Sequence, residues 1–460
     1  MNQYEVVVVG GGINGCGLIR DLALNGVRTL LLEKGDFSSQ TSQSSSKMLH
    51  GGIRYLETYD FGLVQEALEE KNLWLRLTPH LCFEREFYLP LYDYSKYAPW
   101  MLRCGLFLYD FLSHFRNKPH AMLDRRETLD RVPSLDPAGL LGAGKYYDGV
   151  VDDAKLSLEC LYDALLEPCA EALSYHEITS AVRTADGYEL TYASRLHGTS
   201  TTVRTKYLVF TTGPFTDELL PKLGIPWRPR LLLSKGIHLW LREGTIKTSG
   251  SVVLTTKDNR VVFVIPQRNS IMVGTTETPV DQEMFNIRPV DAEIDYLLRT
   301  LAQYFPQANI TRDSIISTFA GVRPLVREDE SVDERGKASR FHKIFRPDSR
   351  TYVLLGGKYT TFRKMTQEIA QEIVPRLGKR YLPNLTLGPL RQKSFMPTFG
   401  PKPQLDLDLV KKIISLEKVS TLEDLVKRRL SLLENVNELK DVMGIPLDLV
   451  KKALDSSSNT

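Results

Sequence analysis

The hydrophobic positions of the N-terminal segment change from strand-like to helix-like spacing and back again. Val6–Val9 is a run of β-branched residues, which is typical of a strand buried on both faces. Gly10–Gly15 follows at once, and the amphipathic stretch Leu18–Leu24 then has helical spacing. Thr29–Glu33 supplies a second apolar strand that ends in an acid. This order predicts a strand–helix–strand unit with a glycine-rich first turn.

The pattern changes beyond Arg228, where short apolar or alternating runs occupy residues 231–233, 236–241, 261–265 and 271–274. Such runs favour an antiparallel sheet, hence a second module. Residues 208–213 and 352–357 return to the parallel-strand style, which indicates that the second module is inserted into the first. Residues 397–403 contain three prolines and a glycine, typical of a linker, and short helices are expected over residues 405–454.

We therefore expect an α/β protein with three parts. A discontinuous Rossmann-like nucleotide-binding domain is predicted over residues 1–80, 145–225 and 345–395. An inserted antiparallel-sheet substrate domain is predicted over residues 81–144 and 226–344, and a short C-terminal helical domain over residues 396–460.

Composition and charge exclude several classes of protein. The chain has 460 residues, of which 42% are hydrophobic and 25% charged, so it is long enough for two or three folded domains. Its net charge of +3 gives no reason to expect a nucleic-acid partner. Five scattered cysteines without a C-x-x-C pair suit a reducing compartment. With no signal-like start and no apolar run of about 18 residues, a cytoplasmic location is expected.

The glycine turn carries the first candidate chemistry. Gly10-x-Gly12-x-x-Gly15 stands between a predicted strand and a predicted helix, where backbone amides and the positive helix end can approach a pyrophosphate. Glu33, at the end of the next strand, can accept hydrogen bonds from ribose hydroxyls. The motif predicts a dinucleotide cofactor and leaves NAD and FAD open.

The next segment bears on that choice. Thr41-Ser42 and residues 44–57 resemble, nearly residue for residue, the flavin-contacting segment of FAD-dependent glycerol-3-phosphate dehydrogenases, which belong to the D-amino-acid-oxidase-like flavoproteins. Further ordered matches extend through about residue 395. They lie at residues 150–154, 211–214, 235–238, 321–325 and 356–361.

The resemblance implies FAD as cofactor. Hydroxyls and Lys47 would serve as donors to phosphate and to flavin carbonyls, and Gly51-Gly52 would let the backbone lie against the ring. The segment at 356–361 would place a helix N-terminus near the reduced ring. The expected cofactor-binding residues are Gly10, Gly12, Ile13, Asn14, Gly15, Glu33, Lys34, Thr41, Ser42, Ser45, Ser46, Lys47, Leu49, His50, Gly51, Gly52, Val182, Gly213, Gly357, Lys358, Tyr359, Thr360 and Thr361.

The resemblance also implies oxidation of sn-glycerol 3-phosphate to dihydroxyacetone phosphate. It points to four cations and one hydroxyl as substrate ligands: Arg54, Arg323, Arg340, Lys358 and Tyr55. A phosphate dianion needs several cationic donors, whereas one arginine usually satisfies a carboxylate. Arg54 and Arg323 stand in motifs bounded by glycine or proline, and we count them with the catalytic set.

Oxidation of a secondary alcohol needs a base for the hydroxyl proton. His238, in the Lys-Gly-x-His motif and on a predicted strand, is the first candidate, and it is also expected to bind substrate. His50 in the flavin segment is its rival. The residues offer no ligand cluster for a metal and no defensible Ser-His-Asp order, so metal and hydrolytic readings are set aside.

The electron acceptor is the least determined part. The resemblance implies a membrane quinone, with oxygen as the alternative acceptor. The basic segment over residues 421–433, with Lys427, Arg428 and Arg429, is similar to the family's terminal basic helix. Peripheral contact with the cytoplasmic face of the inner membrane and a homodimer are both compatible with it. The rival functions are a D-amino-acid-oxidase-like amine or 2-hydroxy-acid oxidase and a flavin-binding sensor without turnover.

Overall fold

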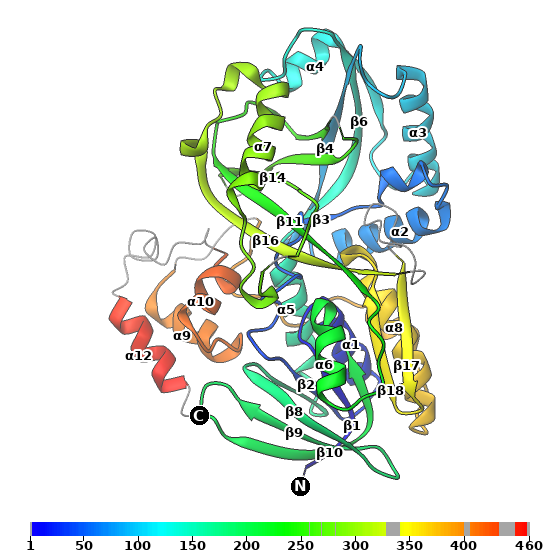
Figure 1. The fold of residues 1–460 in the computed structure, drawn as a ribbon, viewed down its shortest axis with the longest axis vertical. Coiled ribbons are helices and arrows are strands. Elements are labelled where there is room, and N and C mark those ends of the chain that lie inside the picture. Colours follow the sequence, from blue (N-terminus) through cyan, green and yellow to red (C-terminus); the bar gives the residue numbers. More distant parts are fainter. Residues whose placement is uncertain are drawn as a thin grey trace.

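The computed structural model describes residues 2–256, 258–267, 269–280, 282–327, 341–399, 405–431 and 447–457. These residues form two large sheets, one in each half of an elongated molecule, with a helical unit beside the lower half (Figure 1). The expected α/β class is confirmed. Among the described residues, no helix is long and apolar enough to cross a membrane.

The lower sheet is the nucleotide-type sheet. Its central path runs β17-β18-β10-β1-β2-β7, and β9 and β8 extend it from β10. The pairs of β1 with β10 and β2, of β10 with β18 and of β2 with β7 are parallel. Its strands are β1 (Asn2–Val9), β2 (Thr29–Leu32), β7 (Ala170–Leu173), β8 (His176–Arg183), β9 (Tyr188–Ser194), β10 (Ser200–Phe210), β17 (His342–Asp348) and β18 (Thr351–Gly356).

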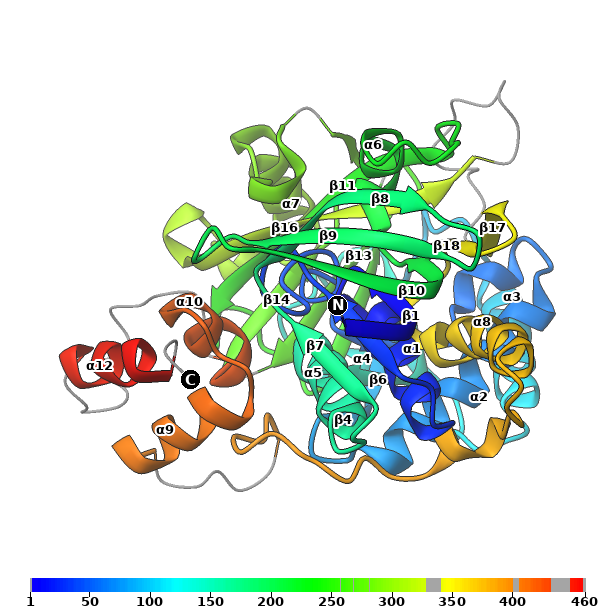
Figure 2. The same ribbon diagram turned by 90° about the horizontal axis from the view of Figure 1, so that it is seen from below.

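Strand β1 explains why its sequence is a continuous apolar run. Val6 and Val8 join the core formed with the helices α1 (Ile13–Leu24), α5 (Asp153–Ala164) and α8 (Phe362–Arg376). Val7 and Val9 face the other side and join the core under β8, β9 and β10. Both faces are therefore covered, as Figure 2 shows from below, and no polar alternation is needed.

The upper sheet has ten strands and is mostly antiparallel. Its path runs β15-β11-β14-β13-β12-β4-β6-β3, with β16 beside β11 and β5 beside β6. Its strands are β3 (Met48–Leu49), β4 (Cys82–Tyr92), β5 (Ala121–Asp124), β6 (Leu140–Val151), β11 (Leu231–Arg242), β12 (Ser251–Thr255), β13 (Val261–Gln267), β14 (Ser270–Gly274), β15 (Thr278–Pro279) and β16 (Ile315–Val326).

The division of the chain between the sheets differs from the predicted boundaries at two places. Met48–Leu49 and the whole of β6 belong to the upper sheet, although residues 1–80 and 145–225 were assigned to the nucleotide domain. The reason is register: β6 pairs with β4 from Cys82↔Val151 to Tyr92↔Leu140, so the strand cannot be divided near residue 145.

The remaining helices pack around these sheets. They are α2 (Phe61–Leu77), α3 (Pro99–Leu112), α4 (Arg125–Arg131), α6 (Thr216–Lys222) and α7 (Asp291–Tyr304). Helix α7 packs against one face of the upper sheet, and α2 and α3 pack against the other. The C-terminal unit contains α9 (Leu407–Leu416), α10 (Leu422–Asp424), the π-helical turn η9 (Leu425–Arg429) and α12 (Leu447–Ser457). It has its own small core around Val410, Ile413 and Leu425.

The basic segment of this unit is not a basic surface. Arg428 and Arg429 are 3% and 0% exposed, and both pair with Asp36. Lys427 is half-buried at the surface and pairs with Glu423. Arg428 and Arg429, although similar in sequence to the family's terminal basic helix, therefore present no charge to solvent, because their charges are paired inside the protein.

Candidate functional site

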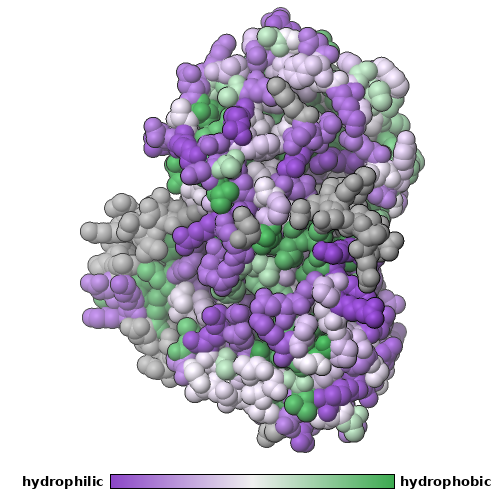
Figure 3. Space-filling view, in the orientation of Figure 1, coloured by the Kyte–Doolittle hydropathy of each residue, from purple (hydrophilic) through white to green (hydrophobic). Residues whose placement is uncertain are grey.

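A cavity of about 1080 Å³ lies where the two sheets meet, and residues from both sheets line it. Its volume is at the upper end of ligand pockets, roughly 300–1,000 Å³. Figure 3 shows that the molecular surface is recessed between the two halves, and hydrophobic residues are visible in the recess. The cavity has room for a large cofactor and a small substrate together.

The glycine turn forms one wall. Gly10 has φ +104°, and a Cβ there would lie 2.7 Å from the carbonyl oxygen of Thr211. A Cβ on Gly15 would lie 1.9 Å from the carbonyl oxygen of Gly10, so the first turn of α1 can close on the strand only with glycine. This is a cradle that leaves the start of α1 open toward an anion.

Glu33 ties this turn to the next strand. Its carboxylate accepts hydrogen bonds from the backbone amides of Gly11 (2.6 Å) and Gly35 (2.7 Å). Ser42 in the following loop accepts one from the amide of Ile13 (2.9 Å). The wall next to the glycine turn is thus built before any ligand arrives, and its polar groups suit a dinucleotide.

Two side chains of the Ser-rich segment, Ser45 and Lys47, bond to a buried carboxylate. Lys47 donates to Asp153 Oδ1 (2.7 Å) and Ser45 donates to Asp153 Oδ2 (2.6 Å). Asp153 begins α5 and is fully buried. Lys47 therefore neutralises a buried carboxylate and does not line the cavity, contrary to its expected role as a donor to the cofactor.

The 356–361 segment meets the flavin-like segment from the other side. The amide of His50 donates to Thr360 Oγ1 (3.2 Å). Gly357 has φ +80°, and Tyr359 and Thr360 form the turn that leads into α8. Lys358, Tyr359 and Thr360 line the cavity, so the N-terminal end of α8 is directed toward it.

Three of the four predicted substrate cations, Arg54, Arg323 and Lys358, line the cavity. Arg323 on β16 donates to Thr275 Oγ1 (2.8 Å) and to the carbonyl oxygen of Thr276 (3.2 Å), which holds the guanidinium in place. The Lys358 ammonium lies 3.6 Å from the ring centroid of Tyr55. Arg54 stands in the short helix η1 (Ile53–Leu56) and is exposed. The side chains of these three cations and of Tyr55 all line the same cavity.

His238 lies on β11, is 2% exposed, and lines the cavity. Its Nε2 is 3.0 Å from Ser46 Oγ, and its ring stacks on Phe319 with centroids 4.8 Å apart. Burial lowers the pKa of His238 well below the usual value of 6.5, and the charges of Arg323 and Lys47 lower it further. The ring is therefore neutral at neutral pH and can accept a proton. His50 also lines the cavity.

Asp148 on β6 was not identified from the sequence. It lines the cavity, is 1% exposed, and accepts a hydrogen bond from Tyr109 (2.8 Å). The amide of Gly51 donates to Tyr109 Oη (2.9 Å). Burial raises the pKa of Asp148 to about 6, in spite of nearby Lys71. No sequence signal marks Asp148, because its partners come from α2, α3 and the flavin-like segment.

The structure separates the candidate cofactor residues into those that line the cavity and those that do not. Leu49 is core, Gly51 packs tightly against Leu68 and Tyr109, and Thr361 lies behind the helix start. Val182 is 57% exposed on β8 and outside the cavity lining; Ile178, near the start of the same strand, lines it instead. The predicted cofactor residues that line the cavity are Gly10, Gly12, Ile13, Asn14, Glu33, Lys34, Thr41, Ser42, Ser45, Ser46, His50, Gly52, Gly213, Gly357, Lys358, Tyr359 and Thr360.

Two further points complete the site. Arg340, a predicted substrate ligand, lies outside the described residues. Within the described ranges, no group of three or more His, Cys, Asp or Glu side chains could hold a metal ion.

Comparison with known proteins connects this site to a family. Residues 5–357 match the protein family described as FAD dependent oxidoreductase. The chain is 32% identical over 403 residues to a glycerol-3-phosphate dehydrogenase of Synechocystis, covering 84% of this chain and 72% of that protein. It is 30% identical over 405 residues to the aerobic glycerol-3-phosphate dehydrogenase of Staphylococcus aureus, covering 87% and 72%.

Among solved structures, the glycerol-3-phosphate dehydrogenase of Bacillus halodurans complexed with FAD superposes with a TM-score of 0.75 at 23% identity. The superposition covers 99% of this chain and 94% of that one. At this identity the likeness concerns the fold.

Proposed function

The chain belongs to the FAD dependent oxidoreductase family, and we propose that it oxidises sn-glycerol 3-phosphate to dihydroxyacetone phosphate in the cavity between its sheets. The observation that carries this proposal is the convergence of Arg54, Arg323 and Lys358 on one cavity with the glycine turn and a neutral histidine. Three cations suit a phosphate dianion better than a single carboxylate.

FAD fits the groups that line the cavity. The cradle at Gly10 and Gly15 and the open start of α1 would hold the pyrophosphate, and Glu33 is at the position for a ribose. Bound FAD supplies the hydride acceptor, the flavin N5, for the hydrogen on the substrate's secondary carbon. The start of α8, at Tyr359 and Thr360, would stabilise negative charge on the flavin side of the cavity.

The substrate is oriented by its phosphate. Arg323 is held by Thr275 and Thr276 before substrate binds, so little side-chain entropy is lost on binding. Lys358 and Arg54 are the other predicted cations in the cavity lining, with Tyr55 as a hydroxyl donor. Arg340 stays a prediction.

His238 accepts the proton of the secondary hydroxyl as the carbon loses its hydride. Its neutral state and its contact with Ser46 inside the cavity fit this role, and His50, which lines the same cavity, stays the alternative base.

Anaerobic titration of the purified yellow protein with glycerol 3-phosphate tests this function. Loss of the oxidised-flavin absorbance is expected at substrate concentrations well below those needed with a 2-hydroxy acid or a D-amino acid. Bleaching by the phosphate-free substrates alone would replace the proposal with an amine or 2-hydroxy-acid oxidase. Absence of bleaching by all of them would indicate a flavin-binding protein without turnover.

We also propose that the electrons pass to a membrane quinone, and that helix α3 is the face that meets the membrane. Trp100, Phe107, Phe111 and Phe115 on or just after α3 are between 56% and 67% exposed, an unusual cluster for a water-facing helix. Arg103, Arg116 and Lys118 are exposed beside them, which suits an anionic lipid surface.

The inner side of α3 touches the flavin-like segment. Tyr109 on this helix bonds with Gly51 and Asp148, so the exposed aromatic side chains and the cavity lie on opposite sides of one helix. α3 stands at the outer edge of the upper half, near α2 (Figure 1). Such a position would bring a lipid-borne acceptor close to the cofactor.

Co-sedimentation with phosphatidylglycerol vesicles at low and high salt tests the membrane face. Changing Phe107 and Phe111 to Ser should abolish binding and lower the rate with a short-chain quinone, whereas a soluble dye should still be reduced. Leu416→Ser, on α9, is the matched control because Leu416 is 57% exposed but remote from α3. Unchanged binding in the double variant would refute this face. Peroxide formation matching substrate consumption would make oxygen the acceptor.

A homodimer stays a prediction, to be read from the sedimentation coefficient of the flavoprotein.

A further inference from the structure

We infer that the C-terminal helical unit is a clamp that holds the cofactor-binding loop, with Arg428 and Arg429 as positioning residues for FAD. The loop in question is residues 36–43, which follow β2 and Glu33. This inference rests on FAD binding alone and not on the identity of the substrate.

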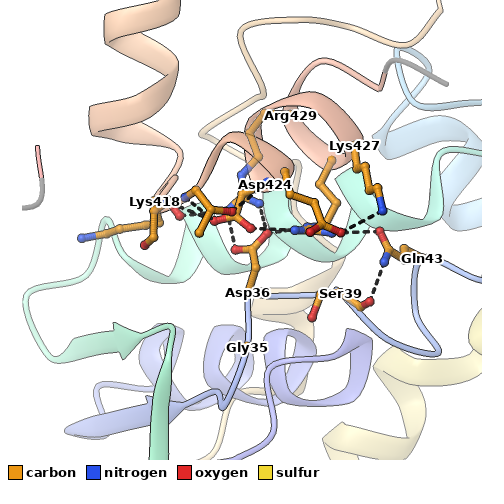
Figure 4. Close-up of polar contacts among 12 residues, drawn as sticks. Gly35, Asp36, Ser39, Gln43, Lys418, Asp424, Lys427 and Arg429 are labelled. Carbon is orange, nitrogen blue, oxygen red and sulfur yellow. Dashed lines mark hydrogen bonds and ion pairs between the residues drawn. The ribbon is translucent and has the colours of Figure 1, made fainter. Parts of the chain in front are cut away.

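The first anchor is Asp36 at the start of the loop. Figure 4 shows Asp36 beneath the turn η9 that carries Arg429, with dashed lines marking the contacts around its carboxylate. Both guanidinium groups donate to Asp36 Oδ2, and Arg429 also donates to Oδ1 at 2.9 Å. Arg429 is held in turn by the carbonyl oxygens of Glu417 (3.0 Å) and Lys418 (2.9 Å).

The second anchor is Gln43 at the end of the loop. Arg428 donates to Gln43 Oε1 (3.2 Å), and the Gln43 amide donates to the carbonyl oxygen of Ser39. Both ends of the loop are therefore attached to one arginine pair. Ser38, Ser39, Gln40, Thr41 and Ser42, which lie between the anchors, line the cavity.

A third path reaches Glu33. Asp424 on α10 accepts hydrogen bonds from Arg428 (2.7 Å) and from Tyr175 Oη (2.7 Å). The amide of Tyr175 donates to the carbonyl oxygen of Gly35 (2.8 Å), and the amide of Gly35 donates to Glu33 Oε1 (2.7 Å). The C-terminal unit thus supports the acid that faces the glycine turn.

The energetic weight of these contacts comes from burial. The side chains of Asp36, Arg428 and Arg429 are 1%, 3% and 0% exposed. Burial opposes ionisation of Asp36, but Arg429 and Arg428 outweigh it and lower the pKa of the carboxyl. Removing one member leaves buried charge uncompensated, which is far more costly than loss of a surface pair. No described residue of 405–431 lines the cavity, so any effect on FAD must pass through the residues that this unit contacts, such as the loop and Tyr175.

Hydrogen–deuterium exchange of the full-length wild-type protein with and without FAD gives the first test. If the clamp and the cofactor both order the loop, FAD must stabilise the clamp by the same free energy with which the clamp stabilises FAD binding. Exchange should slow in residues 36–43 and also in 417–430. Slowing in the loop alone would overturn the inference.

The second test measures the rate of FAD release from full-length variants, followed by the rise in flavin fluorescence without substrate. Asp36→Asn should accelerate release by at least about tenfold, the effect of losing one charge-assisted hydrogen bond. Gln43→Ala removes one anchor without stranding a buried charge, and should give a smaller acceleration in the same direction. Lys427→Gln is the control, because Lys427 pairs only at the surface with Glu423.

The outcomes decide between a clamp and a merely structural unit. FAD release at the wild-type rate in folded Asp36→Asn would overturn the inference. If Asp36→Asn does not fold, Gln43→Ala decides the matter, and unchanged release in that variant would overturn it. Failure of the glycerol 3-phosphate proposal would leave all of these measurements unaffected, since no substrate is present.

Discussion

Replacement of Arg323 by Met separates substrate recognition from cofactor binding. The side chain keeps much of its volume on β16, but the charge and the hydrogen bonds to Thr275 and Thr276 are lost. Arg323 is held by Thr275 and Thr276, which are not residues of the glycine turn, so FAD content should not change.

The magnitude follows from the number of phosphate contacts that one guanidinium makes. A charge-assisted hydrogen bond is worth about 1.5–3 kcal/mol, so loss of one should lower kcat/KM by about 10- to 150-fold. The two bonds that hold Arg323 before binding place the result toward the upper part of this range, because the wild-type side chain is already oriented.

Steady-state kinetics with a soluble dye acceptor, combined with the flavin-to-protein absorbance ratio, provides the assay. Arg312→Gln is the matched control, since Arg312 is an exposed arginine that pairs with Asp291 and Asp295 on α7. Wild-type kcat/KM in Arg323→Met, or a loss of FAD equal to the loss of activity, would refute the assigned role.

Three other outcomes follow from the same geometry. Because burial and neighbouring charge lower the pKa of His238, and a base must be neutral, the acidic limb of kcat/KM should lie below pH 6.5 and disappear in His238→Gln; a wild-type limb above that value would contradict this. Gly274→Ala should reduce kcat while FAD is retained, since its Cβ would lie 2.1 Å from the His238 ring, and an unchanged kcat measured at saturating substrate would be contrary evidence. Gly15→Ala should abolish FAD retention after gel filtration, because its Cβ would lie 1.9 Å from the Gly10 carbonyl oxygen. By contrast, Gly62→Ala lies in open space on α2 and should raise the free energy of unfolding by about 0.5–1 kcal/mol.

Much of the nucleotide half could be predicted because its determinants are local. The β-branched run at Val6–Val9, the glycine turn and the acid at Glu33 are close together in the chain, and each is a strong local signal for a strand, a turn or a strand end. The FAD cofactor and the α/β class are confirmed, and the family match over residues 5–357 accounts for both.

The direction of individual side chains could not be predicted in the same way. Lys47 and Ser46 are neighbours in the flavin-like segment, yet one meets Asp153 and the other His238. Val182 was expected at the cofactor, but its side chain is exposed and Ile178 lines the cavity, because only the start of β8 reaches it. Strand register and burial, which depend on distant segments, decide each case.

The first residues of the sequence are sufficient to predict that a glycine turn joins a buried strand to a helix, because steric and hydrophobic preferences act over a few residues. The tertiary structure alone decided the use of the charges at the other end of the chain. Arg429 meets Asp36 across 393 positions, and this pairing places the charge of a basic segment inside the protein, against the loop that follows β2. No local pattern encodes such a contact, because the energy of a buried charge depends on the partner that folding brings to it.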